Sequence, residues 1–239
     1  VWAGYGRITV LRDVSLSVPK GKTLGIIGPN GSGKTTLMNV LSGQILPSRG
    51  KILLEGRDIS RLSPDIRCHM GIGRTFQVPR PFARLTVREN VVAAAAFSGR
   101  LSRMETRAAV SDVLDAMSLS EKAEIPAGKL SLLDRKRLEI ARALATKPQL
   151  LLLDEIAAGL TSAEVREVLA IVERLKAQEL TILWIEHIIE TMLRAADQLI
   201  CMAEGEVCVS GIPEEVLSSP EVGRLYLGSG SEERKDAGD

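Results

Sequence analysis

The stretch "GPNGSGKTT", residues 28–36, lies between a short apolar run, "KTLGIIG" (22–28), and a segment with helical spacing, "LMNVLSG" (37–43). A buried strand that ends in a glycine-rich turn and continues as a helix is typical of a phosphate-binding loop. The alternative is a glycine-rich turn with a solvent-exposed lysine, and the flanking strand and helix favour the phosphate loop. The residues of this candidate loop are Gly28, Pro29, Asn30, Gly31, Ser32, Gly33, Lys34, Thr35 and Thr36.

The residue types in this loop match the chemistry of phosphate binding. Glycines let successive backbone N–H groups approach phosphate oxygens, and the helix that follows adds the positive end of its dipole. The Lys34 ammonium group can then reach the outer phosphates, and the Thr35 hydroxyl can ligate Mg2+. The loop therefore predicts a phosphate-bearing ligand that binds together with Mg2+.

A second apolar run, "QLLLLDE" (149–155), ends in two carboxylates. Its continuous hydrophobicity is typical of a parallel strand that is buried on both faces. Asp154 is a candidate to hold Mg2+ through water, and Glu155 is a candidate to polarise a water molecule for attack on a terminal phosphate. An Asp-Glu pair after an apolar run is commonly only a strand that meets solvent, but the upstream loop favours the catalytic interpretation.

The remaining patterns alternate between strands and helices. Further strands are predicted in "GKILLEGRDI" (50–59), which a turn follows, in "TILWIEH" (181–187), and in "QLICMAEGEVCVSG" (198–211), as a pair around Glu204-Gly205. Thr161 and Glu164 have the spacing of a capping box at the start of a helix. This alternation predicts an α/β fold with a parallel sheet flanked by helices.

Residues 78–145 differ in character from the rest of the chain. Pro79 and Pro81 interrupt the pattern, and helix-period segments with few strand signals follow. We expect one domain over 1–239, with a core formed by 1–77 and 146–228 and a helical lobe at 78–145. The polar residues 229–239 predict a flexible tail.

Composition excludes several classes of protein. With 45% apolar and 26% charged residues, the chain has the composition of a globular protein. A formal net charge of +1 gives no broad electrostatic footprint for nucleic acid or for an anionic membrane. Its apolar runs fall far short of the roughly 20 residues that span a bilayer, so any membrane association would need a partner. Three cysteines without a CxxC pair favour reduced thiols in the cytosol over a disulfide framework.

Taken in order, the motifs resemble those of the ATP-binding subunit of an ABC transporter, over nearly the whole chain. The matching segments are Tyr5, the loop at 28–36, "RTFQ" ending in Gln77, the signature region at 130, "LLLLDE", "AAGLT" (157–161) and His187 after "TILWIE". The stretches "GIGRTFQ", "LTVREN", "RLEIARAL" and "IEH" are most similar to subunits that energise branched-chain amino acid uptake. The resemblance implies a P-loop NTPase core with an N-terminal antiparallel β part and an inserted helical lobe.

For the chemistry, the resemblance implies ATP and Mg2+ as cofactors. Gln77 would join Thr35 and Asp154 around Mg2+ and the attacking water. Glu155 would be the general base, and His187 would contact the terminal phosphate.

For recognition, the resemblance implies that Tyr5 stacks on adenine and that Ser131, in the signature region, contacts the ATP of a second subunit. The family has a full strand before this aromatic residue, whereas four residues precede Tyr5 here. We therefore expect the natural chain to begin further upstream.

The implied function is ATP hydrolysis that powers import of solutes, of the branched-chain or a related amino acid type, through separate membrane permease subunits. The permeases would meet the lobe after Gln77. A second ATPase subunit, either identical or a sibling, would be another partner. A solute-binding protein would be an indirect partner. Nucleic acid is not an expected partner. The chain would be a peripheral protein at the cytoplasmic face of the plasma membrane.

Two alternatives remain open. One is an ATPase of the same superfamily that remodels nucleic acid or ribosomes, but such proteins usually carry two ATPase halves or a long coiled-coil insertion. The other is a non-hydrolysing or weakly hydrolysing partner subunit. Lys34, Asp154, Glu155 and His187 argue against this second alternative, whereas the signature region argues for some asymmetry.

The chain departs from the family pattern in three places. The family signature is Leu-Ser-Gly-Gly-Gln, and this chain has Leu-Ser-Leu-Leu-Asp at 130–134. Ile156 stands where the family has proline, and Thr161 stands where it has aspartate. Because the signature completes the ATP site of a second subunit, the first departure bears on how well two subunits close around ATP.

The signature segment "LSLLDRKRLEIARAL" (130–144) nevertheless predicts a helix, capped by Ser131 with Asp134 three residues later. The negative charge of Asp134 at the start of the helix interacts favourably with the helix dipole, but it also lies near any bound phosphate. We expect inward packing of Leu133, Leu138, Ile140 and Ala141, and outward-facing Arg135, Lys136 and Arg137. ATP should still bind, with weaker closure than two glycines would allow.

Overall fold

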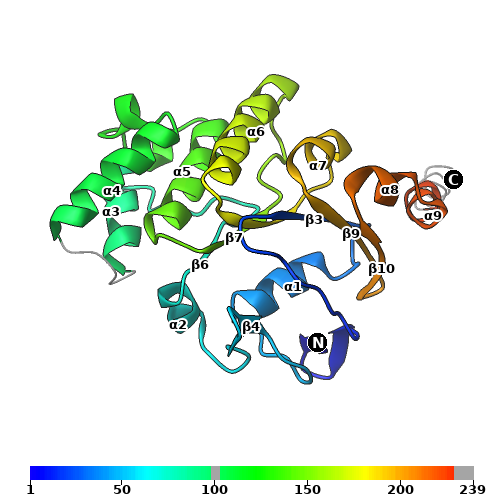
Figure 1. Cartoon of the computed structure of the whole chain (residues 1–239). Helices are drawn as coiled ribbons and strands as arrows, with labels where there is room; N and C mark the ends of the chain where they lie inside the picture. The colour runs from blue at the N-terminus through cyan, green and yellow to red at the C-terminus, as the bar shows by residue number, and fades with distance from the viewer. Residues whose placement is uncertain (98–102, 229–239) are drawn as a thin grey trace, which may run out of the picture. The chain divides into compact units, whose positions relative to one another are not determined.

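The structure is a computed structural model that describes residues 1–97 and 103–228. The chain divides into two compact units, one formed by Val1–Ser63 with Leu183–Asp239 and the other by Pro64–Ile182. Strand β8 (Thr181–Ile185) carries the chain from the second unit back into the first. Figure 1 shows the order of the elements along the chain. The predicted tail at 229–239 lies outside the described residues.

The first unit contains the strand that leads into the phosphate loop. Strand β3 (Thr23–Ile27) is buried at every residue and pairs in parallel with β9 (Gln198–Ala203). Strand β9 also pairs antiparallel with β10 (Glu206–Gly211), and the order in this unit is β10-β9-β3-β8. The buried central position of β3 explains why residues 22–28 are continuously apolar.

The other elements of the first unit are small hairpins and helices. They are β1 (Ala3–Tyr5) with β2 (Ile8–Leu11), β4 (Leu53–Leu54) with β5 (Arg57–Asp58), and helices α1 (Lys34–Leu41), α7 (Ile189–Ala195), α8 (Pro213–Ser218) and α9 (Pro220–Gly228). Both strand pairs are antiparallel, so the N-terminal antiparallel part is confirmed. The strand predicted at 50–59 is shorter than expected, because its turn falls at Glu55-Gly56, where both residues have positive φ.

The second unit contains the strand that ends in the two carboxylates. Strand β7 (Leu150–Asp154) pairs in parallel with β6 (Ile72–Arg74), in the order β8-β7-β6. The helical segments are α2 (Pro64–His69), α3 (Val87–Phe97), α4 (Arg103–Ala116), η1 (Ser120–Lys122), η2 (Ala127–Lys129), α5 (Leu132–Ala145) and α6 (Ser162–Ala177). Helices α3, α4 and α5 lie side by side (Figure 1). The described part of 78–145 is therefore helical, with an isolated β-bridge between Thr86 and Pro126 in place of a strand, as predicted.

The start of helix α6 shows how the local sequence sets an element. The Thr161 hydroxyl accepts a hydrogen bond from the Glu164 N–H, and the Glu164 carboxylate accepts one from the Thr161 N–H at 2.8 Å. This confirms the predicted capping box. With the parallel strands flanked by helices, the α/β class is confirmed as well. Within 1–97 and 103–228, no helix has the length and apolar character needed to cross a membrane.

Candidate functional site

The phosphate loop fills the turn between β3 and α1 in the first unit. Gly28, Gly31 and Gly33 have φ values of 146°, 80° and 101°, a region that other residues rarely adopt. A Cβ atom on Gly28 would lie 2.1 Å from the Met202 carbonyl oxygen, so this position also needs glycine for space. The glycines expected from the sequence are thus required by the backbone.

Lys34 is the centre of the loop. Its side chain is buried, with the residue only 5% exposed, and its ammonium group donates to the carbonyls of Gly28 at 2.7 Å and Pro29 at 2.9 Å. Nearby, the hydroxyl of Ser32 is buried and has no hydrogen-bond partner among the described residues. Thr35 is exposed at the start of α1, where its hydroxyl can meet a ligand. A buried cation and an unsatisfied hydroxyl fit a loop that accepts anionic oxygens.

Residues from the end of the chain support this loop, and the sequence patterns did not indicate them. The Gly28 N–H donates to the phenol oxygen of Tyr226, on α9, at 3.0 Å. The Gly205 N–H, in the β9–β10 turn, donates to the Ser32 carbonyl at 3.1 Å. Burial raises the pKa of Tyr226, so its phenol stays protonated. A single tyrosine far from any motif carries no sequence signal that could have pointed to this contact.

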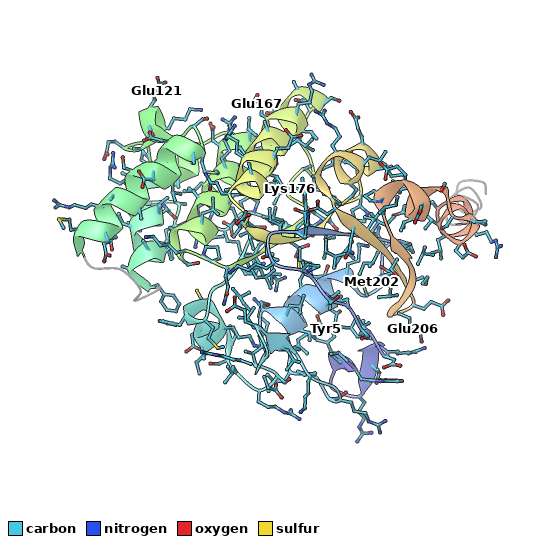
Figure 2. All side chains as sticks on the ribbon, viewed as in Figure 1. Tyr5, Glu121, Glu167, Lys176, Met202 and Glu206 are labelled. Atoms are coloured by element: carbon cyan, nitrogen blue, oxygen red, sulfur yellow. The ribbon has the colours of Figure 1, made fainter. Side chains whose placement is uncertain are left out.

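Tyr5 and His187 are the other predicted residues of the first unit. Tyr5 is 51% exposed at the end of β1, and its phenol oxygen accepts a hydrogen bond from the Asn39 amide at 3.0 Å. Figure 2 shows Tyr5 close to helix α1, which carries Asn39. His187 is exposed just after β8, and its backbone N–H donates to the Glu186 carboxylate at 3.3 Å. Both side chains are accessible to a ligand.

Asp154 and Arg74 form a buried pair in the second unit. Asp154 is 3% exposed at the end of β7, and its carboxylate lies 3.2 Å from the Arg74 guanidinium group, at the end of β6. Burial raises the pKa of Asp154, and Arg74 opposes this shift. Arg74 was not among the predicted residues, although it stands in the quoted stretch "GIGRTFQ".

Glu155 follows Asp154 in an unusual backbone conformation. Its φ of 46° lies in the left-handed region, which costs energy for a residue other than glycine and is often found at functional sites. The Gln77 amide nitrogen donates to the Glu155 carboxylate at 2.5 Å. The structure therefore brings together two of the side chains singled out in the sequence.

Helix α5 contacts Gln77 and Glu155 through Lys136. The Lys136 residue is 2% exposed, and its ammonium group donates to the carbonyls of Gln77 at 2.7 Å and Glu155 at 3.1 Å. The prediction that Lys136 faces outward is wrong, because these two carbonyls offer a buried ammonium group the partners it needs. The predicted inward packing of Leu133, Leu138, Ile140 and Ala141 is confirmed.

The other two basic residues of α5 are also bound within the unit. Arg135 is half-buried and donates to the Leu130 carbonyl at 3.0 Å, and Arg137 has a side chain only 12% exposed that pairs with Glu167. The expectation of an outward-facing basic stripe is therefore wrong for Arg137 and holds only in part for Arg135. Both guanidinium groups therefore bind neighbouring groups of the same unit and stabilise the position of helix α5.

Ser131 caps helix α5, as predicted. Its hydroxyl oxygen accepts the Asp134 N–H at 3.2 Å, and the hydroxyl donates to the Asp134 carboxylate at 2.8 Å. Lys122, on η1, donates to the same carboxylate oxygen at 2.5 Å. Burial alone would raise the pKa of Asp134, but the hydrogen bonds from Lys122 and Ser131 outweigh it and hold the pKa below its ordinary value. The carboxylate is therefore ionised and locally compensated.

The predicted magnesium ligands offer the type of atom that Mg2+ prefers. Thr35 in the first unit and Asp154 and Gln77 in the second supply a hydroxyl, a carboxylate and an amide oxygen, all hard donors. Because the Gln77 amide nitrogen faces Glu155, its oxygen would be the ligand atom. Within the described residues no group of three or more His, Cys, Asp or Glu side chains could hold a metal by itself. Each of these donors is therefore suited to an ion that completes its shell with phosphates and water.

Comparison with known sequences identifies the relatives of this chain. A family model described as ABC transporter matches residues 11–158. The high-affinity branched-chain amino acid transport ATP-binding protein LivG of Salmonella typhimurium is 36% identical, over 94% of each chain. The lipopolysaccharide export system ATP-binding protein LptB of Acidithiobacillus ferridurans is 34% identical, over 95% of this chain and 94% of its own.

Comparison with solved structures gives the same relationship. A nucleotide-free ATP-binding cassette from an ABC transporter matches with a TM-score of 0.86 at 34% identity, over 94% of this chain and 96% of its own. A dimeric ATP-binding cassette in a post-hydrolysis state, bound to ADP and Pi, matches with a TM-score of 0.78 at 26% identity, over 89% of this chain and 95% of its own.

Proposed function

Because this chain belongs to the ABC transporter family, as an ATP-binding subunit that hydrolyses ATP, we propose that it powers import of branched-chain or related amino acids. ATP-binding subunits of this family dimerise and work with membrane permease components. The likeness to LivG over 94% of the chain supports the proposed solute. A similar likeness to LptB makes export of lipopolysaccharide the competing assignment.

The loop would bind the phosphates of ATP. Residues 28–36 present backbone N–H groups and the start of helix α1, and Lys34 would turn from the carbonyls of Gly28 and Pro29 toward the outer phosphates. Thr35, Asp154 and Gln77 would hold Mg2+, which when bound neutralises charge on the phosphates. Tyr5 would stack on adenine, and His187 would contact the terminal phosphate.

Glu155 would accept the proton of the attacking water. The observation that carries this proposal is the Gln77–Glu155 hydrogen bond, since it places an amide and a carboxylate where both could orient one water molecule. Lys136 fixes the backbone of both residues, so their side chains start from a defined position. Ser131 would act on the ATP of a second subunit.

The domain boundaries and the surroundings of the protein are part of the proposal. Residues 1–77 and 146–228 would form the nucleotide-binding core, 78–145 the lobe that meets the permease, and 229–239 a tail. The subunit would be peripheral at the cytoplasmic face of the plasma membrane. It would pair with a copy of itself or with a sibling, and a solute-binding protein would act through the permease.

Substitution of Lys34 tests the mechanism. We expect Lys34→Ala to abolish ATP turnover, because the buried ammonium group is the only candidate in the described loop, 28–36, for neutralising the outer phosphates. Phosphate release by the purified chain measures this effect. Lys22→Ala is the matched control, since Lys22 is an exposed lysine just before the same strand that should not matter for turnover. Unchanged turnover in Lys34→Ala would refute the mechanism.

The solute needs a separate experiment. The chain would be purified from membranes with its permease, reconstituted in vesicles, and supplied with a solute-binding protein. Stimulation of ATP hydrolysis by leucine, isoleucine or valine, with uptake of the amino acid, is the expected result. Co-purification with lipopolysaccharide export components would instead favour the assignment based on LptB.

A further inference from the structure

One carboxylate at the start of helix α5 receives several donors at once. The same oxygen of Asp134 accepts the Ser131 hydroxyl at 2.8 Å and the Lys122 ammonium group at 2.5 Å. Its other oxygen lies 3.5 Å from Arg137, and the Asp134 side chain is only 6% exposed. These three donors are therefore directed at an anion that belongs to the chain itself.

The contact with Ser131 determines where the hydroxyl hydrogen points. A serine hydroxyl has one hydrogen to donate, and Ser131 gives it to Asp134. The Ser131 oxygen meanwhile accepts the Asp134 N–H at 3.2 Å. Serine and aspartate thus bond each other in both directions within one turn, although Ser131 is an exposed residue.

The two-way hydrogen bonding between Ser131 and Asp134 affects function only if Ser131 has an external ligand. The inference therefore rests on the proposed function, in which Ser131 faces the ATP of a second subunit. We propose that Asp134 is a positioning residue that holds the Ser131 hydroxyl within its own helix and so weakens the closure of two subunits around ATP. A phosphate oxygen of the second subunit's ATP has to compete with a charged acceptor for the same hydrogen. Lys122 and Arg137 neutralise the carboxylate and limit its repulsion of phosphate, but the competition remains.

The test measures ATP-driven dimerisation in a Glu155→Gln background, which removes the proposed general base and so keeps ATP intact. We expect Asp134→Asn to lower the protein concentration at half-dimerisation by about tenfold, since an amide oxygen is a weaker acceptor than a carboxylate. Asp134→Gln, which restores the residue type of the family signature, should act in the same direction. Analytical ultracentrifugation with and without MgATP gives the concentrations.

Two further measurements separate positioning from a general effect on the fold. The affinity of the isolated monomer for a fluorescent ATP analogue should stay the same in Asp134→Asn. Asp115→Asn is the matched control, because Asp115 also accepts a serine hydroxyl, that of Ser120, in the same unit, and it should leave dimerisation unchanged.

A double variant tests whether the effect of Asp134 on dimerisation acts through the Ser131 hydroxyl. In a Ser131→Ala background, the gain from Asp134→Asn should shrink to less than about twofold, because no hydroxyl remains to be released. An equal gain in both backgrounds, or no gain from either Asp134 variant while ATP still binds, overturns the inference and leaves the proposed function intact. Absence of ATP binding in every variant and in the parent chain would overturn both.

Discussion

Tyr226 shows at the scale of single residues how a distant side chain can shape a site. Its phenol oxygen is the acceptor for the N–H of Gly28, the first residue of the loop. The backbone there has a φ of 146°, a conformation that glycine adopts readily and other residues rarely do. The hydrogen bond ties the entry of the loop to helix α9.

Removal of this acceptor should weaken nucleotide binding. We expect Tyr226→Phe to reduce ATP affinity by about threefold to tenfold, the cost of one lost hydrogen bond that leaves a partly buried N–H unpaired. Titration with a fluorescent nucleotide measures the change. Ser218→Ala, which removes an exposed hydroxyl from the neighbouring helix α8, is the control and should bind ATP normally. Equal affinity in Tyr226→Phe and the parent chain would show that the contact is not needed.

Asp134 gives a prediction on the pH dependence of stability. Its pKa is lowered in the folded protein, so its ionised form stabilises the fold above the unfolded pKa of about 3.9, and this contribution is lost as pH falls through the lower folded value. Asp134→Asn should therefore lower the free energy of unfolding by about 1 kcal/mol at pH 7, a modest figure because Lys122 is partly exposed. Urea denaturation at pH 7 and near pH 3 checks this. The difference should shrink toward zero in acid, and a constant difference would contradict it.

Helix α5 is the element that links the signature segment to the catalytic candidates. It begins at the Ser131 cap, and one turn later Lys136 reaches the carbonyls of Gln77 and Glu155. A movement of this helix along its axis would therefore displace the backbone of both Gln77 and Glu155. The buried lysine makes α5 part of the site, although no side chain after Asp134 belongs to the signature.

Loss of the Lys136 ammonium group should slow catalysis more than it weakens binding. We expect Lys136→Met to reduce kcat at least about tenfold and to destabilise the fold by about 2 kcal/mol, because two carbonyls lose a charged donor. Nucleotide affinity should change little, because the loop at 28–36 keeps the hydrogen bond from Lys34 to Gly28 and the contact with Tyr226. Lys136→Arg keeps a positive charge and should recover part of the rate. If Lys136→Met folds and retains full kcat, then Lys136 has only a structural role.

The elements could be predicted from sequence where the signal is local. Glycine spacing gave the loop at 28–36, apolar runs gave β3 and β7, and the Thr161 cap gave the start of α6. Long-range contacts could not be predicted in this way, since a single sequence does not show that Tyr226 meets Gly28 or that Arg74 meets Asp154. The expectation for Lys136 failed for a related reason: a basic residue on a helix is usually solvated, and only the fold shows which carbonyls lie within its reach.

At the scale of the whole molecule, activity should depend on more than one chain. The family's ATP-binding subunits dimerise, and the proposed role of Ser131 places it on the ATP of a second copy or sibling. If copies of this chain pair, the rate of hydrolysis per chain should rise with protein concentration and then level off. Phosphate release over about a hundredfold dilution series measures this relation. A rate per chain that does not vary would indicate that one copy suffices, and no hydrolysis at any concentration with ATP still bound would indicate a partner that supplies the chemistry.

The supports of the phosphate loop also determine when the loop can become functional. The ribosome makes residues 28–36 well before the groups that support them, which are the Met202 carbonyl that packs on Gly28, the Gly205 turn and Tyr226. Strand β3 likewise waits for its neighbour β9. Contacts of such large sequence separation form late, because their loop-closure entropy must be overcome first. A nascent chain would therefore expose an apolar strand and an unfinished loop until the residues up to Tyr226 had been made, and ATP could not assist folding before then.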